Sequence, residues 1–317
     1  MKSFIPVLIA AFAVVPTISP AETIVGLTMN DQLFSFDSAS PGLITPRIPI
    51  TGLPPNEFVL AIDFRPVAAD SPFAASNGVL YALGATHHIY TLNTTTGVAT
   101  VVPGGPFPMT GVAFGIDFNP VPDRLRVVSE SDENFRLDPN TGAVAATDTS
   151  LAYAAGDPNV GVNSNVIAAA YTNNFGGAAQ TTLYGIDFAL DALVRQGGVN
   201  GVPSPNTGQL STIGPLGFDT TNEVGLDISG QTGIAYASLT PVVSPLDVAS
   251  RLFTVDLATG QATQVGAIGA AGGPGALVTR DIAAPVGNPV PEPRTLSLLL
   301  ISLAALICRR KLAFTTR

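Results

Sequence analysis

Residues 251–260, RLFTVDLATG, predict a β-strand that runs directly into a tight turn. Leu252–Val255 supplies the β-branched and aromatic residues that strands favour. Asp256 and Thr259 can bond nearby backbone amides, and Gly260 can adopt a positive φ, as such turns require. Related stretches occur upstream at Leu33–Gly42, His88–Gly97 and Asn134–Gly142. This repetition indicates a series of hairpins rather than a single one.

A second kind of strand comes before each hairpin and is apolar along most of its length. Phe58–Phe64, Phe114–Phe118 and Val224–Ile228 each carry one acidic residue near the end. A run that is apolar on both faces is typical of a strand enclosed between two layers. Each is followed by another strand and then by the hairpin, which gives units of four strands, about 45 to 65 residues long. Four strands at this period are the signature of β-propeller blades.

The third unit is the least regular. We expect its inner strand at Val160–Asn163, its second strand at Val166–Tyr171 and its third strand at Thr182–Asp187. A long insertion then precedes the fourth strand, Gln209–Ile213. Gly185–Phe188 resembles the inner strands and could begin a unit instead, so the register stays open here.

The two ends of this region complete each other. Ala276–Ile282 has the pattern of an inner strand with no blade after it. Ile24–Thr28, Leu33–Asp37 and Leu43–Ile48 have the pattern of three outer strands with no inner strand before them. Joined, they form one blade and leave no open sheet edge in the ring. The sequence therefore predicts an all-β fold, a five-bladed β-propeller of four-stranded blades in which strands from both chain ends close one blade.

The chain begins with the features of a secretory signal. Lys2 is followed by the apolar run Phe4–Val15 and by the small residues at Ser19–Ala21. This order is typical of signal peptides, so we expect signal peptidase to remove residues 1–21 and leave Glu22 at the new N-terminus. A buried N-terminal helix is the alternative.

The C-terminal segment, 290–317, combines a short motif, an apolar run and a basic cluster. These are, in chain order, Pro291, Glu292 and Pro293, then Leu296–Ile307, then Arg309, Arg310 and Lys311. The combination resembles the PEP-CTERM sorting signal of Gram-negative bacteria that make extracellular polysaccharide. The resemblance implies processing by an exosortase, with a short transmembrane helix that holds the chain transiently in the inner membrane. An ordinary C-terminal anchor is the alternative, although the run is short for a span of about 20 residues.

The region between these segments, 22–289, is acidic. It carries eight arginines, no lysine and 22 of the 23 acidic residues, a net charge of −14. Such a surface repels phosphate backbones and anionic lipids, which argues against nucleic-acid binding and leaves the tail as the expected membrane contact. The single cysteine, Cys308, lies in the tail, so this region has no disulfide framework.

The region Thr23–Asp281 also resembles a secreted bacterial family, domain of unknown function 4394. The resemblance is carried by Gly26–Thr28, Leu33–Asp37, Gly115–Pro120 and Asp123–Val127. That family often carries the same kind of sorting tail, but it has no established activity to transfer. The resemblance therefore adds context and no chemistry.

Aligning the inner strands places one oxygen-bearing side chain in each predicted blade. These residues are Asp63, Asp117, Asn163, Asp227 and Asp281. Because inner strands surround the centre of a propeller, the five could form a metal site suited to Ca²⁺. They could also bond backbone amides of their own turn or of the neighbouring blade. We expect this structural role and no required cofactor, because repeat packing alone would place one such residue in each blade.

The sequence shows no catalytic constellation of a common type. His87 and His88 are adjacent in extended chain, so their side chains diverge, and no Gly-x-Ser-x-Gly elbow occurs. The acidic cluster Glu130–Glu133 is expected to be a solvated turn. We therefore expect an exported, non-catalytic protein of the cell surface or extracellular matrix, with extracellular polysaccharide as a possible partner.

Two other functions stay open. One is a calcium-dependent propeller enzyme of the lactonase or lyase type, which would use the inner aspartates as its metal site. The other is a glycan- or small-ligand-binding module, for which the insertion Ala189–Pro205 would have to build a concave patch of Tyr and Asn.

Overall fold

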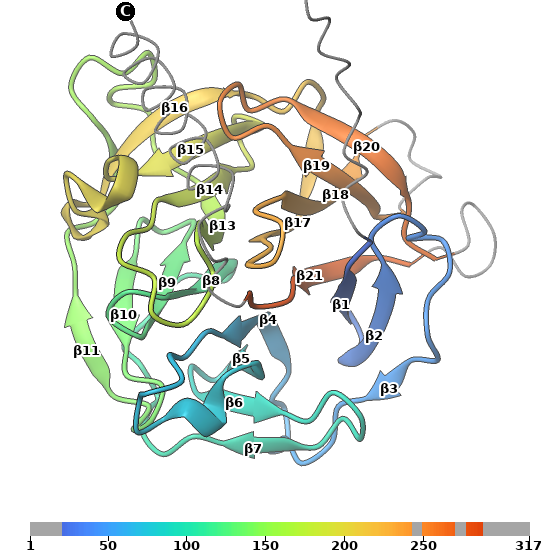
Figure 1. Cartoon of the computed structure of the whole chain (residues 1–317). Helices are drawn as coiled ribbons and strands as arrows, with labels where there is room; N and C mark the ends of the chain where they lie inside the picture. The colour runs from blue at the N-terminus through green and yellow to red at the C-terminus, as the bar shows by residue number, and fades with distance from the viewer. Residues whose placement is uncertain (1–20, 243–248, 270–276, 288–317) are drawn as a thin grey trace, which may run out of the picture.

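The computed structural model describes residues 21–242, 249–269 and 277–287. Five β-sheets stand side by side around a common axis, as Figure 1 shows in a view along that axis. Within the described residues every sheet has four strands except the third, which has five. The predicted five-bladed β-propeller is confirmed.

Three blades follow the predicted order of four consecutive antiparallel strands, with the innermost strand first. They are β4 (Val59–Arg65), β5 (Val79–Gly84), β6 (Ile89–Leu92) and β7 (Ala99–Val101); β8 (Phe114–Asn119), β9 (Arg124–Ser129), β10 (Asn134–Leu137) and β11 (Val144–Thr147); and β17 (Thr220–Ile228), β18 (Ala235–Pro241), β19 (Arg251–Val255) and β20 (Ala262–Ala267). The stretch RLFTVDLATG forms β19 and its turn. There Asp256 accepts the N–H of Ala258 on its side chain and that of Gly260 on its carbonyl, and Gly260 has φ 81°.

One blade is built from both chain ends, as predicted. Its innermost strand, β21 (Thr279–Ala283), pairs antiparallel with β1 (Thr23–Thr28), which is followed by β2 (Gln32–Asp37) and β3 (Ile48–Pro49). The outer strand is shorter than the expected Leu43–Ile48, of which Ile44 forms only an isolated bridge with Phe36. Pro46 explains the interruption, because proline has no N–H to donate to a neighbouring strand.

The third blade differs from the prediction by one strand. Its innermost strand is Val166–Tyr171, and it consists of β13 (Val166–Tyr171), β14 (Leu183–Asp187), β15 (Ala192–Gln196), β16 (Gln209–Pro215) and the parallel edge strand β12 (Ala152–Tyr153). Val160–Asn163 is a turn, and Gly185–Phe188 lies in and after the second strand, so both proposed starts of this unit were wrong. The sequence VIAAAY of β13 is buried throughout but carries no acidic residue, so a search keyed on aspartate passed over it.

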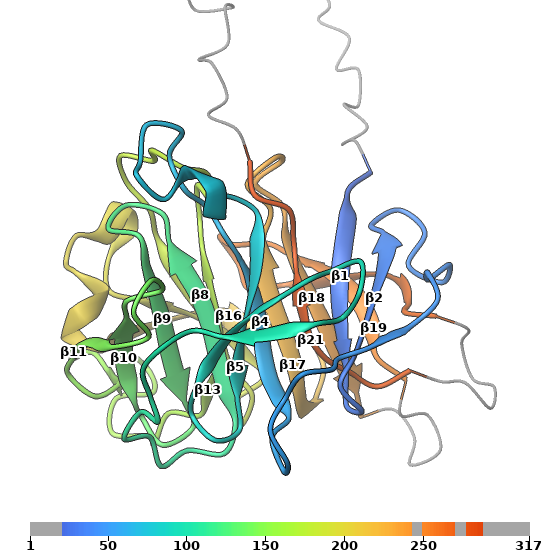
Figure 2. The ribbon, with the colours of Figure 1, turned by 90° about the horizontal axis from the view of Figure 1, so that it is seen from below.

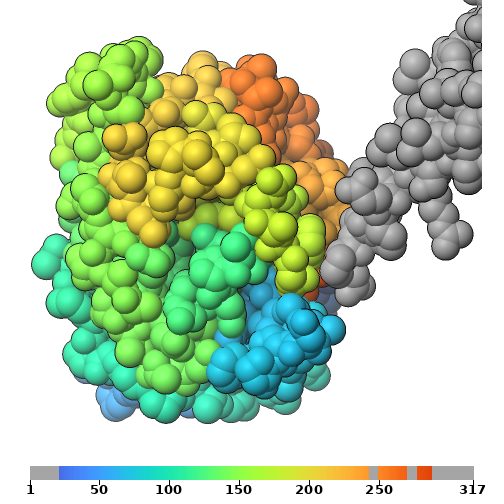
Figure 3. All heavy atoms as spheres, turned by 60° about the vertical axis from the view of Figure 1, so that its left-hand side comes forward, coloured from blue at the N-terminus to red at the C-terminus, as the bar shows by residue number. Residues whose placement is uncertain are grey.

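The long insertion lies between β15 and β16. It contains the short 3₁₀ turns η2 (Val199–Gly201) and η3 (Pro205–Thr207). In Figure 3 yellow atoms of this part of the chain lie on the molecular surface, and Asn206 of the insertion accepts a hydrogen bond from Arg126 on β9 of the second blade. The insertion therefore adds surface to the blade and no further strand to the ring.

The hydrophobic core lies between adjacent blades. One cluster, for example, joins Tyr81 and Leu83 of β5 to Phe118, Leu125 and Val127 of the next blade, all buried. Burial of this kind holds each sheet face against its neighbour. The inner strands are thereby fixed around the axis.

The two described ends of the chain leave the ring on one side. Figure 2 shows the start of β1 and the end of β21 together at the same face. Within the described ranges no helix has the length and apolar character needed to cross a membrane. The predicted signal peptide, apart from Ala21, and the predicted sorting tail, 290–317, lie outside the described residues.

Candidate functional site at the inner aspartates

Four of the five predicted site residues lie together around the axis of the ring. They are Asp63 on β4, Asp117 on β8, Asp227 on β17 and Asp281 on β21, each at most 9% exposed. Asn163 does not join them: it is exposed in the turn before β13, where its Nδ2 donates to the carbonyl of Ser164 at 3.2 Å. Its assignment to the ring was wrong, because the third inner strand carries only alanines, Ala168–Ala170, at this level.

Three of these carboxylates bond the backbone of the next inner strand. The Oδ2 atoms of Asp281, Asp63 and Asp227 accept N–H groups at 2.8, 2.7 and 2.6 Å. The respective donors are Ile62 on β4, Phe118 on β8 and Ala284 directly after β21. The Oδ1 atoms of Asp281 and Asp227 also accept the N–H of the following residue. These bonds are the structural contacts that we expected of all five residues.

Asp117 is the exception. It is 1% exposed, and among the described residues no N–H or hydroxyl group donates to either of its carboxylate oxygens, although its carboxyl lies within hydrogen-bond reach of that of Asp227. The N–H of Tyr171 on β13 lies close enough to favour the charged form, but it forms no bond of ordinary geometry. Asp63 Oδ1 is likewise without a partner. Buried polar atoms of this kind are costly unless something else satisfies them.

The carboxylates of Asp63, Asp117 and Asp227 form a compact cluster. One oxygen from each lies within 4.8 Å of the others. Two full charges no more than 4.8 Å apart repel by at least about 3 kcal/mol at an effective dielectric constant of 20. Burial, and then the neighbouring carboxylates, raise the pKa of Asp63 and Asp117 well above the usual range, and burial raises the pKa of Asp227 to about 7.

No arginine neutralises this cluster within the part of the chain that the structure describes. The ion pairs shown there join Arg65 to Asp123, Arg124 to Asp138, and both Arg126 and Arg136 to Asp148. All of these lie in the blades. The negative charge of the cluster is therefore reduced by protonation or by a bound cation.

A pocket of about 170 Å³ opens beside the beginnings of the inner strands. Its lining includes Leu60, Phe114 and Val224, each three residues before one of the clustered aspartates. Two charged groups also line it. Arg280 donates to the carbonyl of Met29 and its guanidinium lies 5.1 Å from the ring centre of Phe58. Burial raises the pKa of Glu223, although Arg280 partly opposes the shift.

The opposite end of the ring is closed by the loops that follow the inner strands. Gly287 N donates to the carbonyl of Asn174, and Gly230 N donates to that of Pro285. A Cβ at Gly230 would collide with the carbonyl of Asn174, and one at Gly176 with that of Val67. Glycine is required where backbones approach this closely. These contacts close the end of the ring opposite the pocket.

The acidic segment Glu130–Glu133 is not the solvated turn that we expected. Glu133 accepts the N–H groups of Thr110 and Gly111, and Glu130 accepts those of Val112 and Ala113. Val112 and Ala113 line the pocket. These glutamates therefore fix one wall of the pocket.

Two buried arginines escaped the sequence analysis. Arg65, at the end of β4, is fully buried and binds both carboxylate oxygens of Asp123 in the next blade, at 2.8 and 2.5 Å. Arg126 on β9 is 1% exposed and binds Asp148 and, in the third blade, Asn206. A charged residue inside a mostly apolar strand was the available signal. Both arginines join adjacent blades.

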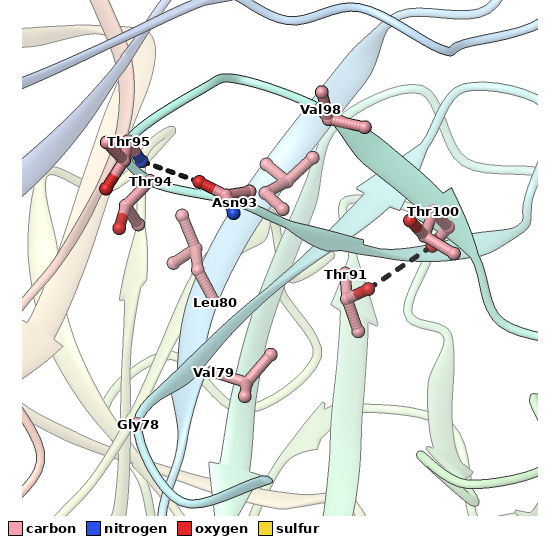
Figure 4. Close-up of a pocket in the computed structure, with 10 residues that line it drawn as sticks. Gly78, Val79, Leu80, Thr91, Asn93, Thr94, Thr95, Val98 and Thr100 are labelled. Atoms are coloured by element: carbon pink, nitrogen blue, oxygen red, sulfur yellow. Dashed lines mark hydrogen bonds between the residues drawn. The ribbon is translucent and has the colours of Figure 1, made fainter.

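Two further hollows are polar. One, of about 300 Å³, is lined by Arg136, Gln180 and the asparagines 119, 200 and 206, but no tyrosine lines it, so the Tyr and Asn patch required for a glycan-binding module is only partly present. The other, of about 480 Å³, is formed by β5–β7 and is shown in Figure 4. Its polar side chains are threonines and Asn93, whose Oδ1 accepts the N–H of Thr95. It contains no ionisable lining residue and so offers hydrogen bonding but no acid–base chemistry.

A family model described as a domain of unknown function, DUF4394, matches residues 32–282. The chain belongs to the DUF4394 family. No curated protein sequence matches this DUF4394 chain. The family assignment agrees with the resemblance seen in the sequence and brings no activity with it.

Two solved structures illustrate the distant similarity of this DUF4394 chain to known folds. BBS1N in complex with ARL6DN has 14% identity and a TM-score of 0.36, over 75% of this chain and 62% of that one, so the chain spans less than two thirds of its length. A 6-phosphogluconolactonase candidate from Bacteroides uniformis has 13% identity and a TM-score of 0.39, over 78% of this chain and 82% of that one. Similarities at this level carry no functional argument.

Proposed function

We propose that this DUF4394 chain is an exported, non-catalytic propeller of the cell surface or extracellular matrix. The observation that carries the proposal is the use of the inner aspartates. Asp63, Asp227 and Asp281 each bind the backbone of the neighbouring inner strand. The groups best suited to chemistry thus hold the ring together, which supports the role of a rigid scaffold.

The course of the chain ends suits delivery by a sorting tail. Gly287, the last described residue, lies at the closed end of the ring, where its N–H bonds Asn174. The pocket with Glu223 and Arg280 lies at the other end. A chain held in the inner membrane through residues 290–317 would therefore present the pocket away from the membrane. Signal peptidase and then an exosortase would act on the two ends, and extracellular polysaccharide would be the neighbouring polymer.

Replacement of Pro291, Glu292 and Pro293 by alanine tests the delivery route. In a host with an exosortase we expect the natural chain at the cell surface or in the medium, shortened at its C-terminus. The triple variant should stay full length in the inner-membrane fraction, whereas Thr295→Ala, just outside the motif, should behave like the natural chain. Equal distribution of the natural chain and the triple variant would contradict sorting through this motif.

A calcium-dependent enzyme is the second candidate, and Glu223 is the observation that favours it. Its carboxyl lines the pocket beside the inner strands that carry the aspartates, and burial raises its pKa, the direction that favours a general base. A panel of lactones and acidic polysaccharides separates the two functions. Turnover that needs Ca²⁺ and disappears in Glu223→Gln would establish the enzyme and overturn the non-catalytic role.

A further inference from the structure

We infer that Asp63, Asp117 and Asp227 form a binding site for one Ca²⁺ ion at the centre of the propeller. The site is independent of the proposed surface role, because a scaffold can be stabilised by a cation without any catalysis. Each residue comes from a different inner strand, and one oxygen from each lies within 4.8 Å of the others. An ion there would tie β4, β8 and β17 together.

The unsatisfied oxygens point to a ligand rather than to repeat packing alone. Both oxygens of Asp117 and Oδ1 of Asp63 are buried, and no N–H or hydroxyl group of the described residues donates to them; the nearest polar group of Asp117 is the carboxyl of Asp227, a second proposed ligand. Asp227 accepts one N–H on each oxygen and keeps a lone pair on each for a metal. If structural bonding were the whole role, Asp117 should hold the next strand as Asp63 does. It does not, although it is equally buried.

The donor set fits a hard cation. The cluster contains only carboxylate oxygens, with no His or Cys, and oxygen donors suit Ca²⁺ or Mg²⁺ rather than Zn²⁺. Ca²⁺ lies about 2.3–2.6 Å from its ligands, so two oxygens on opposite sides of the ion are about 4.6–5.2 Å apart. The three oxygens lie within 4.8 Å of one another, so one Ca²⁺ ion can reach all of them. Mg²⁺ at about 2.0–2.1 Å demands a tighter, octahedral arrangement.

Calorimetric titration of the metal-free, full-length protein with CaCl₂ tests the site. We expect one ion per chain, weaker binding of Mg²⁺, and a higher unfolding temperature in Ca²⁺ than in EDTA. Asp117→Asn keeps the shape of the side chain and removes its charge. Because loss of a supporting residue already weakens metal binding by about 10- to 100-fold, loss of this ligand should weaken it by at least that factor.

Asp187→Asn is the matched control. Asp187 is also fully buried, but it lies outside the cluster and bonds Tyr153 and the N–H of Asn165. The Asp187→Asn variant should bind Ca²⁺ with the same affinity as the natural chain. Weak binding of several ions that persists in Asp117→Asn would reflect only the acidic surface and would overturn the site. Absence of both binding heat and a Ca²⁺-dependent unfolding shift in the natural chain would also overturn it. If Asp117→Asn does not fold, Asp63→Asn replaces it, and retained binding in that variant would overturn the site.

Discussion

The β4–β8 and β8–β13 junctions join equivalent inner strands, yet they are built differently. At the first junction, Asp63 on β4 accepts the N–H of Phe118 on β8, and Ala61 stands two residues before it. At the second, Asp117 on β8 has no bonded donor, and Gly115 occupies the position that corresponds to Ala61. A Cβ at Gly115 would lie 2.5 Å from the Cα of Ala168 on β13.

The difference shows that the neighbouring inner strand determines whether a repeated aspartate accepts a backbone hydrogen bond. β13 has only methyl side chains at Ala168–Ala170, so it can approach β8 closely and the junction is held by packing. Asp63 and Asp117 occupy the same position in the repeat, yet Asp63 binds the backbone of the next inner strand and Asp117 does not. The four predictions that follow test this contrast, beginning with the largest expected effect.

Each junction contains one buried arginine, Arg65 at the first and Arg126 at the second, and its loss should be the most damaging change at that junction. Arg65→Met leaves Asp123, whose side chain is 25% exposed, without its ion pair, and Arg126→Met leaves the buried Asp148 with Arg136 as its remaining ion-pair partner. Removal of one partner of a fully buried pair costs about 3–5 kcal/mol, so each substitution should cost about 3 kcal/mol, the lower end of that range. Chemical denaturation should show losses of similar size for the two variants. Arg136→Met, which removes a 27% exposed side chain from Asp148, is the milder control, and an equal loss there would contradict this account.

Gly115→Ala should harm the β8–β13 junction by about 1–3 kcal/mol, because the new methyl group overpacks the contact with Ala168. The β4–β8 junction naturally carries that methyl group at Ala61. Ala61→Gly should therefore cost only about 0.5–1 kcal/mol, the usual penalty of glycine in a strand. Thermal unfolding of the two variants compares the junctions directly. A harmless Gly115→Ala would mean that close packing does not hold β8 against β13.

Substitution of an aspartate that binds the next inner strand should destabilise the protein more than substitution of one that does not. In EDTA, Asp281→Asn leaves one of two buried N–H groups, those of Ile62 and Ile282, without an acceptor. This should cost about 1–3 kcal/mol. Asp117→Asn breaks no bond to an N–H group and removes a carboxylate that the carboxylates of Asp63 and Asp227 repel. In EDTA the free energy of unfolding of this variant should therefore be unchanged or higher. Equal destabilisation by both substitutions would remove the distinction between the junctions.

The sequence predicted the elements that depend on local patterns. The hairpin turns at Asp256–Gly260 and its relatives, the closure of a blade by β1 and β21, and four of the five inner strands followed from alternation and turn residues. The third inner strand did not, because VIAAAY has no periodicity that separates an innermost strand from any other buried strand. The hydrogen-bond state of Asp117 depends on how closely β13 approaches, which no local pattern encodes.

Asn163→Ala is expected to have the smallest effect and tests the corrected register. If Val160–Asn163 were the inner strand, Asn163 would sit among the central carboxylates and its loss would disturb them. In the structure it is exposed in a turn and bonds only neighbouring residues, so the change in stability should stay within about 0.5 kcal/mol, and Ca²⁺ affinity should not change. Unfolding curves and calcium titrations compare the stability and the Ca²⁺ affinity of this variant with those of Asp117→Asn, whose substituted residue lies in the ring. A loss of calcium affinity in Asn163→Ala would return Asn163 to the ring and place β13 one strand further out.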